Sequence, residues 1–183
     1  MNRTTVTTLA WVAAAGLGVG FAVWYPTEAS VMGQMPAHNT QSLTRAPVSL
    51  PAGLPSERTL ALVTFNKNQR AQADSWIDGM NLKTDTNISW VRIPVLGDPD
   101  TPEGRSEGEK RLLERYTAEA ERARMLPMFI DKASFARATG LKSTEQAYAV
   151  VLNRDGEVLA RVAGPFDADK AQLLRETLAV TAR

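Results

Sequence analysis

The strongest constraint on the fold is the order of the apolar segments from residue 59 onward. Runs typical of buried strands alternate with stretches that have helical spacing. This order predicts an α/β domain with a partly parallel sheet, because parallel strands need helical crossovers. The expected elements are a strand over 60–65, a helix over 69–80, a strand over 88–96, a loop over 97–102, a helix over 107–124, an extended piece over 128–130, one or two helical turns over 133–138, strands over 147–153 and 158–163, and a helix over 167–180.

The last two strands carry the clearest local signal. They are joined by a short segment that contains Asp155 and Gly156. An Asp-Gly step between apolar runs predicts a β-hairpin, because glycine accepts the positive φ that the turn demands. The hairpin adds an antiparallel edge to the sheet. The fold class expected for residues 59–183 is therefore a three-layer α/β sandwich with a mixed central sheet.

Composition excludes several kinds of chemistry. The chain has no cysteine, which excludes disulfides, cysteine-ligated metals and cysteine nucleophiles. His38 is the single histidine, so a serine–histidine triad is excluded unless it uses that residue. With 21 basic and 20 acidic residues, the net charge of +1 does not fit a general nucleic-acid binder.

The first 25 residues differ from the rest and predict a membrane anchor. Residues 4–24 carry no charge, and as a helix they would span roughly 31 Å, about the thickness of the bilayer core. Arg3 precedes this segment and Trp24 ends it, which favours a cytoplasmic amino terminus and a periplasmic domain at a bacterial inner membrane. A cleaved signal peptide is the alternative.

Residues 26–58 are expected to form a flexible tether. They contain five prolines and show neither helical nor strand periodicity. A flexible chain of this length has a root-mean-square reach of roughly 30 Å. Within it, Met32, Met35 and His38 form a Met-x-x-Met-x-x-His pattern whose soft ligands suit Cu(I), although coincidence is the stronger interpretation. No cofactor is expected.

Three segments resemble thioredoxins and peroxiredoxins. The sequence AVVLNRDGEVLARVAG from residue 149, with the leucine-rich helix after it, resembles their carboxyl-terminal half. LPMFID from residue 126 and FARATGL from residue 135 resemble a peroxiredoxin pattern, and 60–80 resembles the first strand and helix. The resemblance implies a thioredoxin-like fold. Residues 62–76 are also faintly similar to a mitochondrial ATP-synthase assembly factor family that does without cysteine chemistry.

The resemblance also implies where an active site should lie. These families place a reactive cysteine where the first strand enters its helix, and a cis-proline just before the hairpin. Here the first position reads NKNQRAQ over 66–72, and Tyr148 stands in the register of the proline. Both hallmarks of the redox site are missing, so thiol–disulfide exchange and peroxidase activity do not transfer to this chain.

A binding site remains possible at the same loop. The expected residues are Asn66, Lys67, Asn68, Gln69, Arg70 and Gln72, with Tyr148 at the rim of the sheet. Open α/β sheets bind ligands at this edge, unpaired backbone N–H groups hold anions, and the two basic side chains add charge. The alternative is a solvated loop without a ligand. Trp76, on the helix that follows, is expected in the core.

The acidic residues Asp98, Asp100, Glu103, Glu107 and Glu109 could hold a divalent cation, but their spacing favours a plain surface.

We expect a non-enzymatic, membrane-anchored module that binds a periplasmic protein or assembles a membrane complex. The alternative is a small-anion or copper-binding protein, or a non-thiol enzyme, that uses the loop at 66–72.

Overall fold

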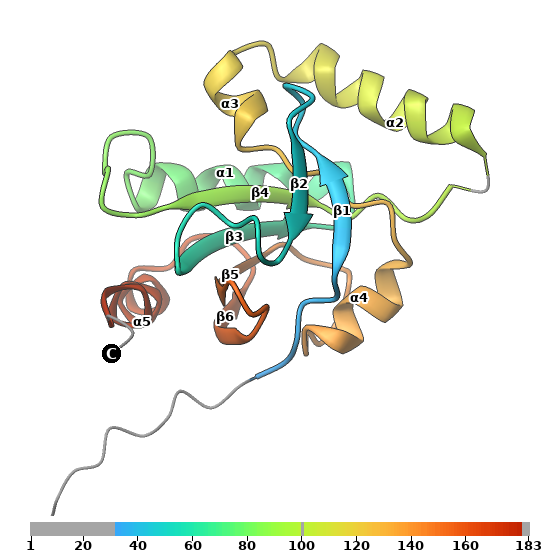
Figure 1. Ribbon diagram of the computed structural model, residues 1–183. Helices are drawn as coiled ribbons and strands as arrows, with labels where there is room; N and C mark the ends of the chain where they lie inside the picture. Colours follow the sequence, from blue (N-terminus) through green and yellow to red (C-terminus); the bar gives the residue numbers. More distant parts are fainter. Residues whose placement is uncertain (1–31, 100, 181–183) are drawn as a thin grey trace, which may run out of the picture.

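The computed structural model describes residues 32–99 and 101–180. Its centre is a four-stranded sheet in the spatial order β4 (Trp90–Pro94), β3 (Arg58–Thr64), β5 (Tyr148–Asn153) and β6 (Val158–Ala163) (Figure 1). β3 and β4 run parallel, whereas β5 is antiparallel to both β3 and β6. The mixed sheet predicted from the order of the elements is therefore confirmed.

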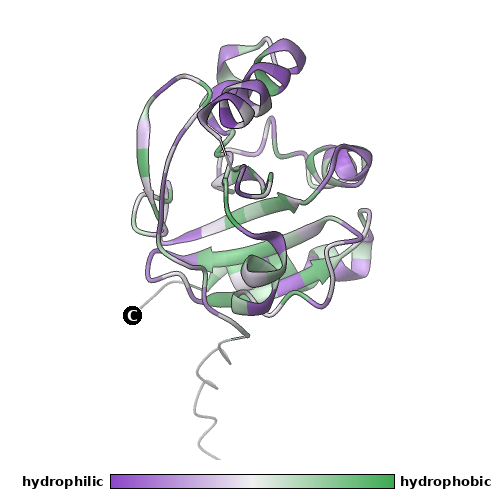
Figure 2. Ribbon diagram, turned by 90° about the vertical axis from the view of Figure 1, so that its right-hand side faces the viewer, coloured by the Kyte–Doolittle hydropathy of each residue, from purple (hydrophilic) through white to green (hydrophobic). Residues whose placement is uncertain are grey.

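Helices cover both faces of the sheet. Leu60 and Leu62 of β3 pack in one core with α1 (Arg70–Gly79) and α5 (Ala168–Ala179). The alternate residues of β3 enter a second core, to which α4 (Lys132–Ala138) contributes. This division follows from the two-residue period of a strand and explains why 60–65 is a continuous apolar run. Figure 2 shows the hydrophobic residues gathered on the strands and hydrophilic residues along the helices.

Two local predictions are confirmed in this framework. Gly156 has a φ of +88° in the turn between β5 and β6, as the Asp-Gly step requires. Trp76 is fully buried in the core beneath α1, and its indole Nε1–H donates a hydrogen bond of 2.9 Å to the Gly164 carbonyl. Its polar atom is thus satisfied inside an apolar site.

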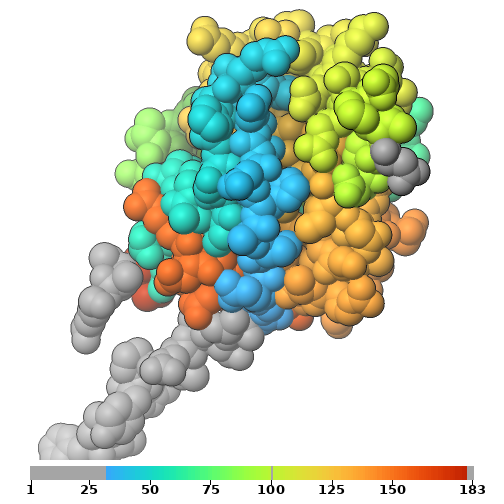
Figure 3. All heavy atoms as spheres, turned by 45° about the vertical axis from the view of Figure 1, so that its right-hand side comes forward, coloured from blue at the N-terminus to red at the C-terminus, as the bar shows by residue number. Residues whose placement is uncertain are grey.

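Residues 32–58 are part of the domain, which corrects the flexible tether predicted over 26–58. β1 (His38–Gln41) and β2 (Pro47–Leu50) form an antiparallel hairpin that crosses the sheet in Figure 1 and runs beside α2 and α4 in Figure 3. Met35, Leu50 and Leu54 are each at most 3% exposed and belong to the core that includes α4.

Residues 32–58 are held in place by contacts with residues that are distant in the sequence. The backbone N–H of Met32 donates to the Val158 carbonyl, and that of Met35 donates to the Gly156 carbonyl. The few apolar side chains of the segment are separated by prolines and polar residues, so they show no local period. Their burial depends on strands more than a hundred residues away, which sequence spacing does not reveal.

The helix expected over 107–124 is two helices. α2 (Pro102–Arg115) starts earlier, because the Thr101 hydroxyl caps it by accepting a hydrogen bond from Gly104 N, with Pro102 at the first helical position. The chain then breaks at Tyr116, which is extended, before α3 (Glu119–Ala123). The Tyr116 side chain turns inward at this break and packs with Leu112 and Met125.

The extended piece expected over 128–130 lies along the outer edge of β4. Met128 forms an isolated parallel bridge with Val95, and Met125, just before this piece, forms another with Arg92. The helices expected over 69–80, 133–138 and 167–180 are confirmed as α1, α4 and α5, within two residues at each end.

The predicted anchor, residues 1–25, lies outside the described residues. Within 32–99 and 101–180, no helix combines the length and apolar composition that crossing a membrane requires.

Candidate functional site

A cavity of about 480 Å³ lies at the carboxyl ends of β3 and β4, on the face of the sheet that α1 covers. Leu62 and Thr64 of β3 and Pro94 of β4 line it from the sheet, and Gly108 and Leu112 line it from α2. Six further apolar or aromatic residues contribute to the wall: Phe65, Leu96, Pro99, Tyr116, Met125 and Phe129. The cavity therefore occupies the edge at which open α/β sheets bind ligands.

Three backbone N–H groups of the loop predicted to bind an anion are hydrogen-bonded within the loop itself. The loop forms a single 3-10 turn, η1 (Lys67–Gln69), in which the N–H groups of Asn68 and Gln69 donate to the side-chain and backbone oxygens of Asn66. The N–H of Arg70 donates to the Lys67 carbonyl. These three amides are therefore already engaged within the loop and are not available to hold a ligand.

Three of the predicted loop residues do reach the cavity. Asn66, Lys67 and Arg70 line it, whereas the exposed Asn68 does not. Lys67 is exposed and Arg70 is half-buried. Neither cation forms an ion pair with an acidic residue of the described ranges. The loop thus supplies its positive charge through side chains.

The other predicted loop residues have structural roles. Gln69 is 2% exposed; its Oε1 accepts a hydrogen bond of 2.7 Å from Phe65 N, and its Nε2 donates to the Thr144 carbonyl. The Gln72 Oε1 accepts a hydrogen bond of 2.8 Å from Ala147 N. These glutamines connect the start of α1 to the segment that precedes β5.

Tyr148, expected at the rim of the sheet, is a core residue. It is 4% exposed, and its ring lies edge-on to Phe65 with the centroids 6.4 Å apart. Its hydroxyl accepts a hydrogen bond from Ser143 N. The side chain is therefore not part of the cavity wall.

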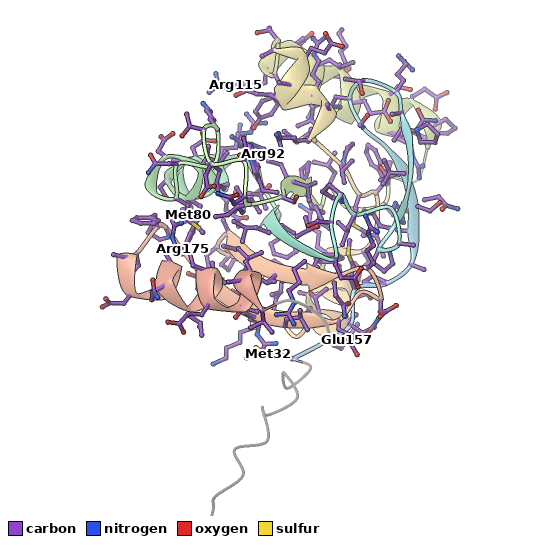
Figure 4. All side chains as sticks on the ribbon, turned by 60° about the vertical axis from the view of Figure 1, so that its left-hand side comes forward. Met32, Met80, Arg92, Arg115, Glu157 and Arg175 are labelled. Carbon is purple, nitrogen blue, oxygen red and sulfur yellow. The ribbon has the colours of Figure 1, made fainter. Side chains whose placement is uncertain are left out.

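Arg92 is the principal site residue that sequence reasoning missed. It is 8% exposed in the middle of β4, and its Nη2 donates a hydrogen bond of 2.6 Å to Asp74 Oδ1 on α1. Its guanidinium also lies 5.3 Å from the centre of the Tyr116 ring. Figure 4 shows Arg92 between the sheet and the α2–α3 segment that carries Arg115. A charged residue inside the apolar run ISWVRIPVL was the available signal, because a buried charge needs a partner.

Arg92 also lines a second, polar cavity of about 260 Å³ on the other side of Tyr116. Asp74 and Asp78 of α1 contribute to it, together with Lys83 and Arg115. Arg92 thus lies between the cavity of about 480 Å³, which has many apolar lining residues, and this smaller, polar cavity.

Two of the five acidic residues singled out in α2 and its preceding loop are paired with arginines. Glu107 pairs with Arg111 at 3.1 Å, and Asp98 lies 3.6 Å from Arg105. Glu103 and Glu109 form no ion pair within the described ranges, and Asp100 lies outside them. Among the described residues, no group of three or more histidine, aspartate and glutamate side chains could hold a metal ion.

The Met-x-x-Met-x-x-His residues lie in different environments. Met35 is 1% exposed and belongs to the core, whereas Met32 is 43% exposed. His38 is half-buried in β1, where burial and then the charge of Arg105 lower the pKa of its imidazole, against an opposing effect of Asp98. Met35 is therefore accounted for by packing, and copper binding has no support from this arrangement.

The fold is thioredoxin-like. A structure described as a putative electron transfer protein from Aquifex aeolicus VF5 superimposes with a TM-score of 0.57 at 11% identity, covering 82% of this chain and 95% of that one. A structure of BsSco, a member of the Sco family of cytochrome c oxidase assembly proteins, gives 0.54 at 16% identity, covering 81% and 95%. The exposed lipoprotein thioredoxin Etrx1 of Streptococcus pneumoniae strain TIGR4 gives 0.51 at 8% identity, covering 77% and 99%.

These similarities establish the architecture, and the sequence limits its chemistry. No protein family matches the chain, and no curated protein is similar to it. Because the chain has no cysteine, the thiol–disulfide exchange associated with this fold is not available to it. The protein is a cysteine-less thioredoxin-like domain that keeps a cavity at the edge of the sheet where the thiol site was expected.

Proposed function

We propose that this protein is a redox-inactive binding module, anchored in a bacterial inner membrane, that holds a protein partner during assembly of a membrane complex. The proposal rests on the cavity beside residues 66–70, which is lined both by apolar residues and by the basic side chains of Lys67 and Arg70. Mixed apolar and charged walls suit specific recognition, because apolar contact supplies affinity and charge supplies orientation. No side chain in the cavity offers thiol chemistry.

The short distance between the predicted anchor and the folded domain limits where the cavity lies relative to the membrane. The first described residue, Met32, is already hydrogen-bonded to β6, and the predicted anchor ends at Trp24. The residues between them span at most about 29 Å when extended, so the domain would stay close to the bilayer. In Figure 4, Met32 lies at the lower end of the domain and Arg92 lies above it, toward the α2–α3 segment. This supports a cavity that lies away from the membrane-facing end of the domain, toward periplasmic parts of other proteins.

Affinity purification of the full chain from detergent-solubilised native membranes tests this role. We expect a defined complex that survives washing and that is lost when Lys67→Gln and Arg70→Gln are combined. The matched control combines Lys142→Gln with Lys170→Gln, two exposed lysines that do not line the cavity. The proposal fails if no complex forms, or if both double variants retain the same complex.

A second candidate function is binding of a small anion without a protein partner. It is favoured by the two cavity cations that have no acidic partner within the described ranges. Binding of a small anion by the purified chain, together with the absence of any co-purifying protein, would favour this second function over the first.

A further inference from the structure

We propose that the cavity beneath α2 binds a monocarboxylate that carries an apolar body. This inference rests on the proposed binding role and names the chemistry that the cavity recognises. It depends on the charges that line the cavity and on the apolar walls behind them.

The charges favour an anion. Arg92 and Arg111 both line the cavity, but Asp74 pairs with the first at 2.6 Å and Glu107 with the second at 3.1 Å. Asp98 also lines the cavity and lies 3.6 Å from Arg105. These pairs are close to neutral, so they neither attract nor repel an anion strongly.

Lys67 and Arg70 supply the positive charge that remains. Both line the cavity, and no acidic residue of the described ranges pairs with either of them. Together they leave a charge of about +2 that attracts an anion, and the guanidinium can bind a carboxylate through two parallel hydrogen bonds. A phosphate ester would pair with the same two cations, so the titration below compares a carboxylate with inorganic phosphate.

The walls behind these cations favour an apolar body. Phe129 is 7% exposed and Leu112 is 4% exposed, and both line the cavity with the half-buried Leu96. α2 approaches closely only because it has glycine here: a Cβ on Gly108 would lie 3.2 Å from the Phe129 ring. A volume of about 480 Å³ is within the range that holds a small organic ligand.

Calorimetric titration of the full chain in detergent, with a detergent-only blank, tests this inference. The probe is 4-phenylbutyrate, which has one carboxylate and an aromatic body. Its neutral analogue 4-phenylbutyramide removes the charge, acetate removes the body, and inorganic phosphate tests a more highly charged anion. We expect saturable one-to-one binding of 4-phenylbutyrate, with the three other compounds at least tenfold weaker.

The double variants used for purification locate the site. Combining Lys67→Gln with Arg70→Gln should raise the dissociation constant of 4-phenylbutyrate at least tenfold, whereas Lys142→Gln with Lys170→Gln should leave it unchanged. Thermal unfolding of each variant checks that the fold is intact. Equal binding of the amide, tighter binding of phosphate, no binding at millimolar concentration, or no effect of the cavity variant would each overturn the inference.

Two further probes distinguish the source of the carboxylate. A short peptide that ends in phenylalanine with a free carboxyl terminus is compared with the same peptide amidated. If the free-acid peptide binds more tightly than 4-phenylbutyrate, and the amidated one does not, the cavity reads the terminus of a partner chain. If 4-phenylbutyrate binds and neither peptide does, the ligand is a free carboxylate.

Failure of this inference can be told apart from failure of the proposed function. If 4-phenylbutyrate does not bind, but the membrane complex is still lost with the Lys67 and Arg70 variant, the binding role stands and the ligand class is wrong. If 4-phenylbutyrate binds as expected but the same membrane complex is recovered with the Lys67 and Arg70 variant, the protein-binding role is wrong instead.

Discussion

One face of the sheet is covered in two different ways. Toward β5 and β6, α1 and α5 close it with a dense apolar core around Trp76, which has no exposed surface. Toward β4, the covering element is α2, whose single buried residue is Leu112, and a cavity remains beneath it. The first region can be explained by packing alone. The second buries an arginine, which packing alone does not favour, so we assign stability to the first and recognition to the second.

Four substitutions test this difference between the two regions. The largest expected loss of stability comes from a substitution in the dense apolar core. Trp76→Ala should lower the free energy of unfolding by about 3–5 kcal/mol, because it removes a fully buried aromatic side chain and its hydrogen bond to Gly164. Chemical denaturation of the full chain in detergent measures the change. A loss below about 1 kcal/mol would show that this region is less tightly packed than the structure implies.

Asp74→Asn tests the buried cation on the cavity side. It weakens the charge-assisted partner of Arg92 and should cost about 1–3 kcal/mol of unfolding free energy. The control is Asp78→Asn on the same helix, an exposed residue that forms no ion pair within the described ranges. Equal stability of the two variants in denaturant titrations would mean that Arg92 does not depend on Asp74.

Thr101→Ala should loosen α2 itself. It removes the hydroxyl that accepts a hydrogen bond of 3.2 Å from Gly104 N, and loss of such a cap costs about 1 kcal/mol. Hydrogen exchange should speed up in the first turns of α2 and remain unchanged in α1, whose start is tied to the sheet by Gln69. Faster exchange in both helices would contradict the separation of the two regions.

His38 should give the smallest effect, seen as a pH dependence. Because its pKa is lowered in the folded protein, the unfolded chain binds more protons near the ordinary value of 6.5. The stability contributed by the neutral imidazole is thus complete above that value and is lost as the pH falls through the lowered pKa.

Comparing unfolding free energies at a pH above that window and at one below it checks this prediction, and His38→Gln should abolish the difference. The carboxyl of Asp131, whose pKa is lowered by its hydrogen bonds to Ser134, titrates at more acidic pH and serves as an internal reference. Imidazole resonances followed by NMR give the sign directly, since His38 is the only histidine in the chain. A raised pKa would contradict the prediction.

Much of the sheet was predictable because its signals are local. The apolar run of β3 and the Asp155-Gly156 turn can each be predicted from a few neighbouring residues. The site was predictable in part for the same reason: Lys67 and Arg70 follow a strand that ends where ligands bind. The structural hydrogen bonds of Gln69 and Gln72 were not predictable, because their partners, Thr144 and Ala147, are distant in the sequence.

The sequence by itself determined the class of fold and the absence of thiol chemistry, since alternating strands and helices are a local pattern and a missing sulfur atom cannot be supplied by folding. Tertiary structure alone decided that residues 32–58 close one face of the sheet and that Arg92 meets Asp74 beneath a cavity. The physical reason is that burial is a non-local property. A proline-rich segment acquires order, and a charged side chain in a strand acquires a partner, only when remote parts of the chain provide the other half of each contact.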